Sequence, residues 1–365
     1  MPTPDILVRG AGAVGLTAAL SLARLGLQVA LLGRPPAADD LRAYALNPAS
    51  VELLRSLKVW DALPADARTP VYDMHVEGDA GAVIEFSAWQ QHVEALAWIV
   101  DASALERALD AAVRFAPHVS RVDAEVPAAL QVLAEGRDSA TRERLGIAMP
   151  LAGYGQRAVA ARLQADWPHG GIARQWFRSP DVLALLPFDR PRAGHGYGLV
   201  WSLPDTRAEA LLALPAADFE QALAEATRGA AGPLRLSGER AAWPLALAHA
   251  ERVAGAGWVL VGDAAHLVHP LAGQGLNLGL ADVRALAAVL AAREPWRPLG
   301  DERLLARFAR ARAAPTRAMG HVTDALLHLF AAEQPIWKEL RNRGLTLVNH
   351  LPPLKRFLTA RALDA

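Results

Sequence analysis

The sequence predicts a mixed α/β fold, in which a Rossmann-like domain is interleaved with an antiparallel-sheet domain and followed by C-terminal helices. Three observations support this prediction. A strand, a glycine-rich turn and a helix open the chain, a second strand–turn–helix covers residues 258–290, and short strands without intervening helices fill residues 154–203. Strands that alternate with helices indicate a parallel sheet, whereas consecutive strands indicate an antiparallel one.

The N-terminal segment carries a dinucleotide-binding fingerprint in the structural context that it requires. A short apolar strand at Asp5–Val8 leads through the turn GAGAVG into a helix from about Leu16 to Leu25, and Gln28–Leu32 forms the next strand. The glycines allow a tight turn, a close approach of the backbone to a diphosphate, and close packing of helix on strand. The residues expected to bind a nucleotide here are Gly10, Gly12, Ala13, Val14 and Gly15.

One part of this fingerprint is missing at the end of the second strand. The acidic residue that normally binds the adenosine ribose is replaced by Gly33 and Arg34. A cation here is typical of a site for a 2′-phosphate, so Arg34 is a candidate cofactor-binding residue and NADP is an alternative nucleotide. Losing one charged hydrogen bond would weaken binding by about 1.5–3 kcal/mol. Asp39 or Asp40 could replace the missing carboxylate.

The middle of the chain predicts a second, antiparallel layer. An alternating segment from Val71 to Phe86 indicates a hairpin, and a strand at Ala97–Asp101 leads into a helix. Further strands are expected at Ala158–Leu163, Ala173–Phe177, Val182–Pro187 and Tyr197–Leu203. The aromatic residues Trp176, Phe177 and Trp201 either line a pocket for an aromatic ring or belong to the core, and the core is the commoner location.

Composition excludes several classes of function. The 38 basic and 38 acidic residues leave no net charge that would favour a nucleic-acid partner. The absence of cysteine excludes disulfides and thiol chemistry, and fits a reducing cytoplasm. We expect neither a signal peptide nor a membrane span. The tail from Leu326 to Leu363 mixes apolar and basic residues, so it either lies on an anionic membrane surface or packs on its own domain or a partner.

The stretch from Trp258 to Asp282 is a second nucleotide-site signature. A short apolar strand ends at Gly262-Asp263, which places a carboxylate at the strand end, and glycines then precede a helix that continues to Leu290. Glycines at such a junction let a ligand approach the backbone closely. The unpaired N–H groups of a helix N-terminus favour an anion, or a ring with electron density at one edge.

The spacing GDAAH-x3-P-x2-GQG-x-N-x-G-x2-D resembles the C-terminal flavin motif of aromatic hydroxylases with the para-hydroxybenzoate hydroxylase fold, most closely the ubiquinone-biosynthesis hydroxylase family. The resemblance implies that Gly262 and Asp263 bind the ribityl part of FAD, and that Arg42 lies beside the flavin and diphosphate. The residues that it places at the reactive edge and pyrimidine end of the isoalloxazine ring are Pro270, Gly273, Gln274, Gly275, Leu276 and Asn277. The first three of these are the candidate catalytic residues.

The same resemblance implies a FAD-dependent monooxygenase that uses NAD(P)H and O2 to hydroxylate an aromatic ring. The implied substrate is a polyprenylated phenol on the route to ubiquinone. Further expectations are a biosynthetic complex or homo-oligomer and peripheral contact with the inner membrane. No metal site is predicted. The expected division is a FAD-binding domain at 1–70, 98–152 and 246–300, a substrate domain at 71–97 and 153–245, and a C-terminal helical segment at 301–365.

Two alternatives stay open at this point. One is a hydroxylase of another aromatic compound, and the other is a non-catalytic relative that acts as a scaffold in a biosynthetic complex. Three departures from the family pattern motivate the scaffold: Gly33, the short Phe115–Gly136 segment, and Glu135, which stands where a FAD- and NAD(P)H-binding motif has Asp. The extra methylene of Glu135 would displace its carboxylate by about a bond length, enough to disturb a positioned contact.

Overall fold

A parallel sheet forms the first layer of the fold. The computed structural model describes residues 3–34, 40–78, 81–268 and 274–314 of the chain. In the six-stranded sheet, with the order β15-β16-β9-β1-β2-β8, all neighbours run parallel except β15 and β16. The strands are β1 (Ile6–Arg9), β2 (Val29–Leu32), β8 (Val119–Val122), β9 (Leu130–Leu133), β15 (Ala254–Gly255) and β16 (Trp258–Leu260). The short segment after Phe115 thus supplies two parallel strands, β8 and β9.

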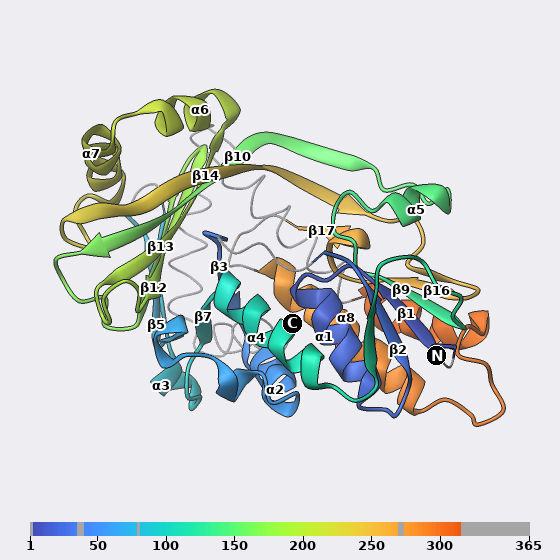
Figure 1. Cartoon of the computed structure of the whole chain (residues 1–365). Helices are drawn as coiled ribbons and strands as arrows, with labels where there is room; N and C mark the ends of the chain where they lie inside the picture. Colours follow the sequence, from blue (N-terminus) through green and yellow to red (C-terminus); the bar gives the residue numbers. More distant parts are fainter. Residues whose placement is uncertain (1–2, 35–39, 79–80, 269–273, 315–365) are drawn as a thin grey trace.

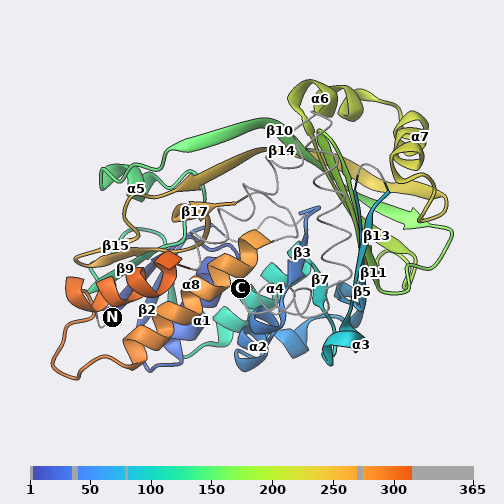
Figure 2. The same cartoon turned by 180° about the vertical axis from the view of Figure 1, so that it is seen from behind.

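Three helices pack together beside this sheet. They are α1 (Ala13–Ala23), α4 (Ala102–Phe115) and α8 (Gln274–Ala291), and Figures 1 and 2 show α1 flanked by α4 and α8. Because α1 is covered on both sides, almost all of its residues are small or apolar and buried. Gly279 permits the close approach of α8, since a Cβ atom there would lie 2.7 Å from Cγ2 of Val14. A further helix covers residues 302–314.

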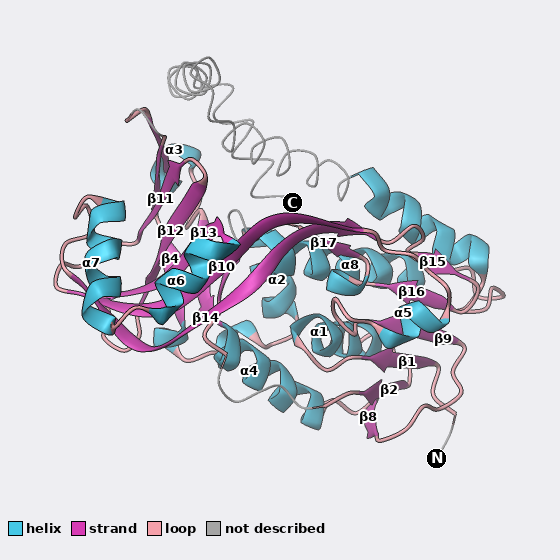
Figure 3. Cartoon of the chain, turned by 90° about the horizontal axis from the view of Figure 1, so that it is seen from above, coloured by secondary structure: helices cyan, strands magenta, loops and turns pink. Residues whose placement is uncertain are grey.

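The second layer is an eight-stranded sheet in the order β17-β14-β10-β13-β12-β11-β5-β6, antiparallel except for the β11–β5 pair. Its long strands β10 and β14 extend from the half that contains the six-stranded sheet to the far end of the molecule (Figure 3). The strands are β5 (Asp73–Glu77), β6 (Val83–Ser87), β10 (Leu151–Ala165), β11 (Ile172–Arg178), β12 (Asp181–Phe188), β13 (Gly196–Pro204), β14 (Leu234–His249) and β17 (His266–Leu267).

Helices α6 (Asp205–Ala213) and α7 (Ala216–Thr227) cover the outer face of this sheet (Figure 1). Trp176 and Trp201 are buried in the core beneath them, and Phe177 is buried in a smaller cluster with Val182. None of the three aromatic residues lines the cavity described below. The core interpretation of these residues is therefore confirmed.

A small three-stranded sheet, in the order β3-β7-β4, joins the two layers. Asn47 caps the N-terminus of the neighbouring helix α2 by accepting a hydrogen bond from the backbone N–H of Ser50 at 2.8 Å. The remaining elements are β3 (Ala43–Leu46), α2 (Pro48–Ser56), η1 (Trp60–Ala62), η2 (Ala65–Ala67), β4 (Arg68–Val71), α3 (Ala88–Gln91), β7 (Ala97–Asp101), α5 (Ala140–Arg144) and η3 (Gly262–Ala264).

The C-terminal tail predicted to contact a membrane or a partner falls in 315–365, outside the described residues. Within the described residues, no helix is long and apolar enough to cross a bilayer. The peripheral membrane contact, the complex or homo-oligomer and the domain boundaries stay predictions.

Candidate active site

A cavity of about 600 Å³ lies between the two layers. One wall consists of the start of α1, strand β3 and the start of α8, and the opposite wall is the inner face of the eight-stranded sheet. Of the residues predicted to bind the cofactor, those that line this cavity are Gly12, Ala13, Val14, Arg42, Asp263, Gly275, Leu276 and Asn277. Two glycine-rich segments more than 250 positions apart in the sequence therefore meet at one site.

The three glycines of the N-terminal turn have different roles. A Cβ atom at Gly10 would lie 2.1 Å from the carbonyl oxygen of Ala134, and one at Gly15 would lie 1.9 Å from that of Gly10. These two glycines are required for packing. At Gly12 the nearest atom to an added Cβ is 4.0 Å away, so this glycine leaves open space at the first turn of α1. Gly12 is thus the position where a ligand can approach the backbone.

The other end of the cavity is formed by the start of α8. An added Cβ atom at Gly275 would meet nothing within 4 Å, so its backbone also faces open space. The side chain of Asn277 links α8 to β3 and α2: its Nδ2 donates to the carbonyl oxygen of Ala45 at 2.8 Å, and its Oδ1 accepts from the hydroxyl of Ser50. Of the candidate catalytic residues, Pro270 and Gly273 lie outside the described residues, and only the backbone of Gln274, where α8 begins, is described.

Arg42 extends along the cavity wall between the two ends. Its guanidinium forms an ion pair with Asp40 at 2.5 Å and lies 5.5 Å from the ring centre of Tyr44. Burial opposes ionisation of Asp40, but the hydrogen bonds and positive charge of Arg42 outweigh it and lower the pKa of that carboxyl group. The Asp40–Arg42 pair therefore stays ionised across the physiological range.

Asp263 presents an unpartnered carboxylate to the cavity. No described residue donates a hydrogen bond to it, although His266 and Arg42 lie near enough to attract its charge. Desolvation by the surrounding protein raises the pKa of the Asp263 carboxyl group, although the residue is exposed to the cavity. A carboxylate that faces the cavity without a protein donor is suited to a ligand that supplies hydroxyl donors.

Near Asp263 lies a cluster of three charged residues: His266 and Asp282, which are buried, and Arg312, whose side chain is 11% exposed. The Asp282 carboxylate accepts hydrogen bonds from Nε2 of His266 at 2.7 Å, from the backbone N–H of Gly262 at 2.9 Å and from Nε of Arg312 at 2.6 Å. This cluster fixes the turn that carries Asp263.

We predict a pH dependence of stability from His266. Burial alone would lower the pKa of its imidazole, but the charge and hydrogen bond of Asp282 outweigh burial and raise it. A raised pKa in the folded state means stabilisation that is complete below about pH 6.5, the unfolded value, and is lost as the pH rises through the folded pKa. The Tm of the ligand-free protein should therefore fall above about pH 6.5, by about 2–4 °C for each kcal/mol lost.

Calorimetric scans of the wild type and a His266→Gln variant between pH 6 and pH 9 measure this effect. The glutamine amide keeps a donor for Asp282 but does not titrate, so the fall of Tm with rising pH should be smaller in the variant. An equal fall of Tm in the two proteins would show that another group causes the pH dependence.

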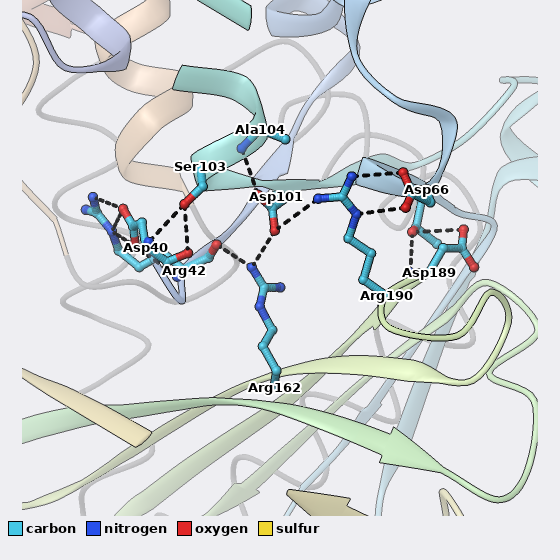
Figure 4. Close-up of polar contacts among 10 residues, drawn as sticks. Asp40, Arg42, Asp66, Asp101, Ser103, Ala104, Arg162, Asp189 and Arg190 are labelled. Atoms are coloured by element: carbon cyan, nitrogen blue, oxygen red, sulfur yellow. Dashed lines mark hydrogen bonds and ion pairs between the residues drawn. The ribbon is translucent and has the colours of Figure 1, made fainter. Parts of the chain in front are cut away.

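A network of ion pairs joins the inner face of the sheet to the Arg42 loop (Figure 4). Arg162 of β10 donates to the carbonyl oxygen of Arg42 at 2.7 Å and pairs with Asp101 at 3.3 Å. Asp101 also caps α4 through the N–H of Ala104 and lies 3.9 Å from Arg190. Asp101 is thus a structural cap of α4 and lies outside the cavity lining.

The remaining predicted residues lie away from the cavity. Arg34 is exposed just beyond the end of β2, and a Cβ atom at Gly33 would lie 2.8 Å from the backbone nitrogen of Ala11, so a glycine fits there best. Glu135 turns away from the cavity: it pairs with Arg9 at 3.0 Å and accepts hydrogen bonds from residues at the start of α5. The Glu135 side chain thus accepts hydrogen bonds at the start of α5, while its neighbours Ala134 and Gly136 line the cavity.

The wall provided by the sheet is mainly apolar. One row of neighbouring residues runs across five strands in register: Ala160, Val200, Ala184, Gln175 and Val76. All five line the cavity, and Gln175 is the one polar side chain among them. It makes no hydrogen bond to any described residue. Small alanines in this row leave room for an apolar ligand beside the amide.

The residues present fit a bound FAD. Open backbone at Gly12 beside the N-terminus of α1 suits the diphosphate. The unpartnered Asp263 carboxylate suits ribityl hydroxyls, and the open start of α8 suits the pyrimidine end of the ring.

Comparison with known proteins agrees with this geometry. A family model described as an FAD binding domain matches residues 3–131 and 110–322 of the chain. Ubiquinone hydroxylase UbiL of Rhodospirillum rubrum is 32% identical, over 98% of this chain and 89% of the relative. The chain belongs to the ubiquinone-biosynthesis hydroxylases, a family of FAD-dependent aromatic monooxygenases. This hydroxylase is also similar to the 3-demethoxyubiquinol 3-hydroxylase of Escherichia coli, with 30% identity over 96% of each chain.

The fold has solved counterparts as well. The structure of p-nitrophenol 4-monooxygenase PnpA from Pseudomonas putida superposes with a TM-score of 0.77, covers 100% of this chain and 98% of its own, and is 18% identical. At that identity the likeness establishes the shared fold. The prediction of a para-hydroxybenzoate hydroxylase-type architecture is confirmed.

Proposed function

We propose that this hydroxylase acts on a phenol that bears a long apolar substituent, as an intermediate of ubiquinone synthesis does, and that it uses NAD(P)H and O2. The observation that carries the proposal is the continuity of one cavity from the first turn of α1 to the apolar inner face of the sheet. The printed names of the two relatives support the choice of substrate class.

Each part of the cavity has a role in the proposed reaction. Backbone N–H groups at Gly12–Val14, with Arg42, would hold the diphosphate of FAD, and Asp263 would accept hydrogen bonds from its ribityl hydroxyls. When bound, FAD would supply the redox chemistry, namely hydride acceptance from NAD(P)H and transfer of one oxygen atom of O2 to the ring. The partial positive charge at the start of α8 would stabilise negative charge that develops at the pyrimidine end. The apolar wall keeps water away from the reacting centre.

The test uses purified protein reconstituted with FAD. We expect a yellow 1:1 complex that NADH or NADPH bleaches under anaerobic conditions, faster when a prenylated phenol is present. A colourless protein that added FAD neither colours nor stabilises would overturn the proposal and favour a scaffold role. A deletion strain should accumulate the unhydroxylated precursor, and accumulation of an unrelated aromatic compound would favour the alternative substrate.

Gln175 is the group that we predict orients the phenol. Its amide faces the cavity with no hydrogen bond to any described residue, and its neighbours in the row are apolar. Replacing it in a Gln175→Leu variant removes one hydrogen bond worth about 1–1.5 kcal/mol. We expect KM for a prenylated phenol to rise about 5- to 10-fold, with the FAD affinity unchanged.

Steady-state kinetics on FAD-loaded protein measure this effect. Gln164→Leu, on β10 and outside the cavity lining, is the matched control. An unchanged KM in Gln175→Leu would show that the phenol is oriented by another group.

A further inference from the structure

Glu106 places a carboxylate at the position where the proposed function requires a diphosphate. It projects from α4 into the cavity, and its side chain is largely buried, with the residue 8% exposed. Its Oε1 atom lies 4.0 Å from where a Cβ atom on Gly12 would be, and Gly12 is the N-cap of α1. The protein's own carboxylate thus lies beside the N-terminus of this helix.

Glu106 forms no ion pair with any described residue, and the guanidinium of its nearest cation, Arg42, is engaged by Asp40. The other ionisable groups that face Glu106 are Asp40, Tyr44 and, farther along the cavity, Asp263. Asp40 and Asp263 add negative charge to the same region. Burial raises the pKa of Glu106, the charge of Arg42 lowers it, and the charge of Asp40 raises it again, with a net increase.

A diphosphate and an ionised Glu106 compete for the same site. Both are anions, both are suited to the first-turn N–H groups of α1, and both would lie in a cavity shielded from bulk water. Two anions held side by side in such a cavity cannot both stay ionised without a large cost in free energy. A neutral carboxylic acid avoids this repulsion.

We propose that Glu106 takes up a proton from solvent when FAD binds, so that cofactor loading is linked to pH through this one residue. The inference rests on the proposed FAD site and adds a specific group to it. Between the pH at which Glu106 ionises in the free protein and the higher pH at which it ionises in the complex, binding consumes one proton. In that window the FAD affinity falls about tenfold per pH unit.

Two measurements on the full-length protein test the proposal. Fluorescence titration gives the dissociation constant of FAD from pH 5 to pH 9, and calorimetry in buffers of different ionisation enthalpy gives the number of protons taken up. The wild type should take up about one proton per FAD within the window. Glu106→Gln should take up none, bind with little pH dependence, and be about tenfold tighter than the wild type at pH 8. Glu52→Gln on α2, whose side chain is 71% exposed, should behave as the wild type does.

Glu106→Ala provides a second neutral variant in case the glutamine variant folds poorly, and it should show the same loss of proton uptake. Tm values of the free proteins verify folding. FAD binding with equal proton uptake in the wild type and both variants would overturn the inference alone. Failure of every variant and of the wild type to bind FAD at any pH would overturn the proposed function together with it.

Discussion

A Gly12→Ala variant is expected to keep its fold and to lose most of its affinity for FAD. The added Cβ atom meets no protein atom closer than 4.0 Å, and the extended backbone of Gly12, with φ −78° and ψ −178°, suits alanine. The methyl group projects into the space where the diphosphate must approach the first turn of α1. We expect the dissociation constant of FAD to rise about 10- to 100-fold, equivalent to about 1.4–2.7 kcal/mol.

Gly153→Ala is the matched control for this variant. Gly153 lies on β10, outside the cavity lining, and an added Cβ atom would also meet nothing within 4 Å. Titration of FAD into the three ligand-free proteins, with their Tm values, separates binding from folding. Wild-type affinity in Gly12→Ala would place the diphosphate somewhere other than the first turn of α1.

Of the variants described here, Asp282→Asn is expected to lose the most free energy of unfolding. Asp282 is 1% exposed and neutralises both His266 and Arg312. Burial opposes its ionisation, but the charges of these two residues and the N–H of Gly262 outweigh it and lower the pKa of its carboxyl group. Removing the charge leaves Arg312, whose side chain is 11% exposed, without its counter-ion in a largely desolvated site, at a cost of about 3–5 kcal/mol. We expect the Tm to fall by about 10 °C.

Asp138→Asn is the control, because the side chain of Asp138 is 95% exposed. Chemical denaturation of both variants gives the change in free energy of unfolding. Because Asp282 also holds the turn before Asp263, the Asn variant should bind FAD more weakly even where it stays folded. A loss below 1 kcal/mol would show that the cluster is not a structural support.

Local sequence patterns predicted the elements that depend on local chemistry. The four-residue apolar strands, the glycine turn ahead of α1 and the start of α8 all follow from spacing and from the conformational freedom of glycine. In each case the constraint comes from neighbours within a few residues along the chain. For Trp176 and Trp201 the core was favoured because large aromatic side chains are commonly buried.

Features that depend on distant partners were not predictable in this way. The sequence alone does not show that Arg312 reaches Asp282 across 30 positions, or that Arg162 joins β10 to the Arg42 loop. The contacts of Glu135 with Arg9 and the start of α5 were likewise not predictable, and its effect on a cofactor contact stays a prediction. The position of Glu106 in the cavity was not predictable, because an acidic residue on an amphipathic helix is ordinarily exposed.

The measurement that tests the central claim most directly is incorporation of isotopic oxygen. FAD-loaded protein, NAD(P)H and a phenol with a short prenyl chain are incubated under 18O2, and the product is analysed by mass spectrometry. If FAD at Gly12 and Asp263 shares one cavity with a substrate on the apolar sheet, one 18O atom enters the ring for each NAD(P)H consumed. Oxidation of NAD(P)H with only hydrogen peroxide formed and no labelled phenol, across substrates of this class, would contradict the account.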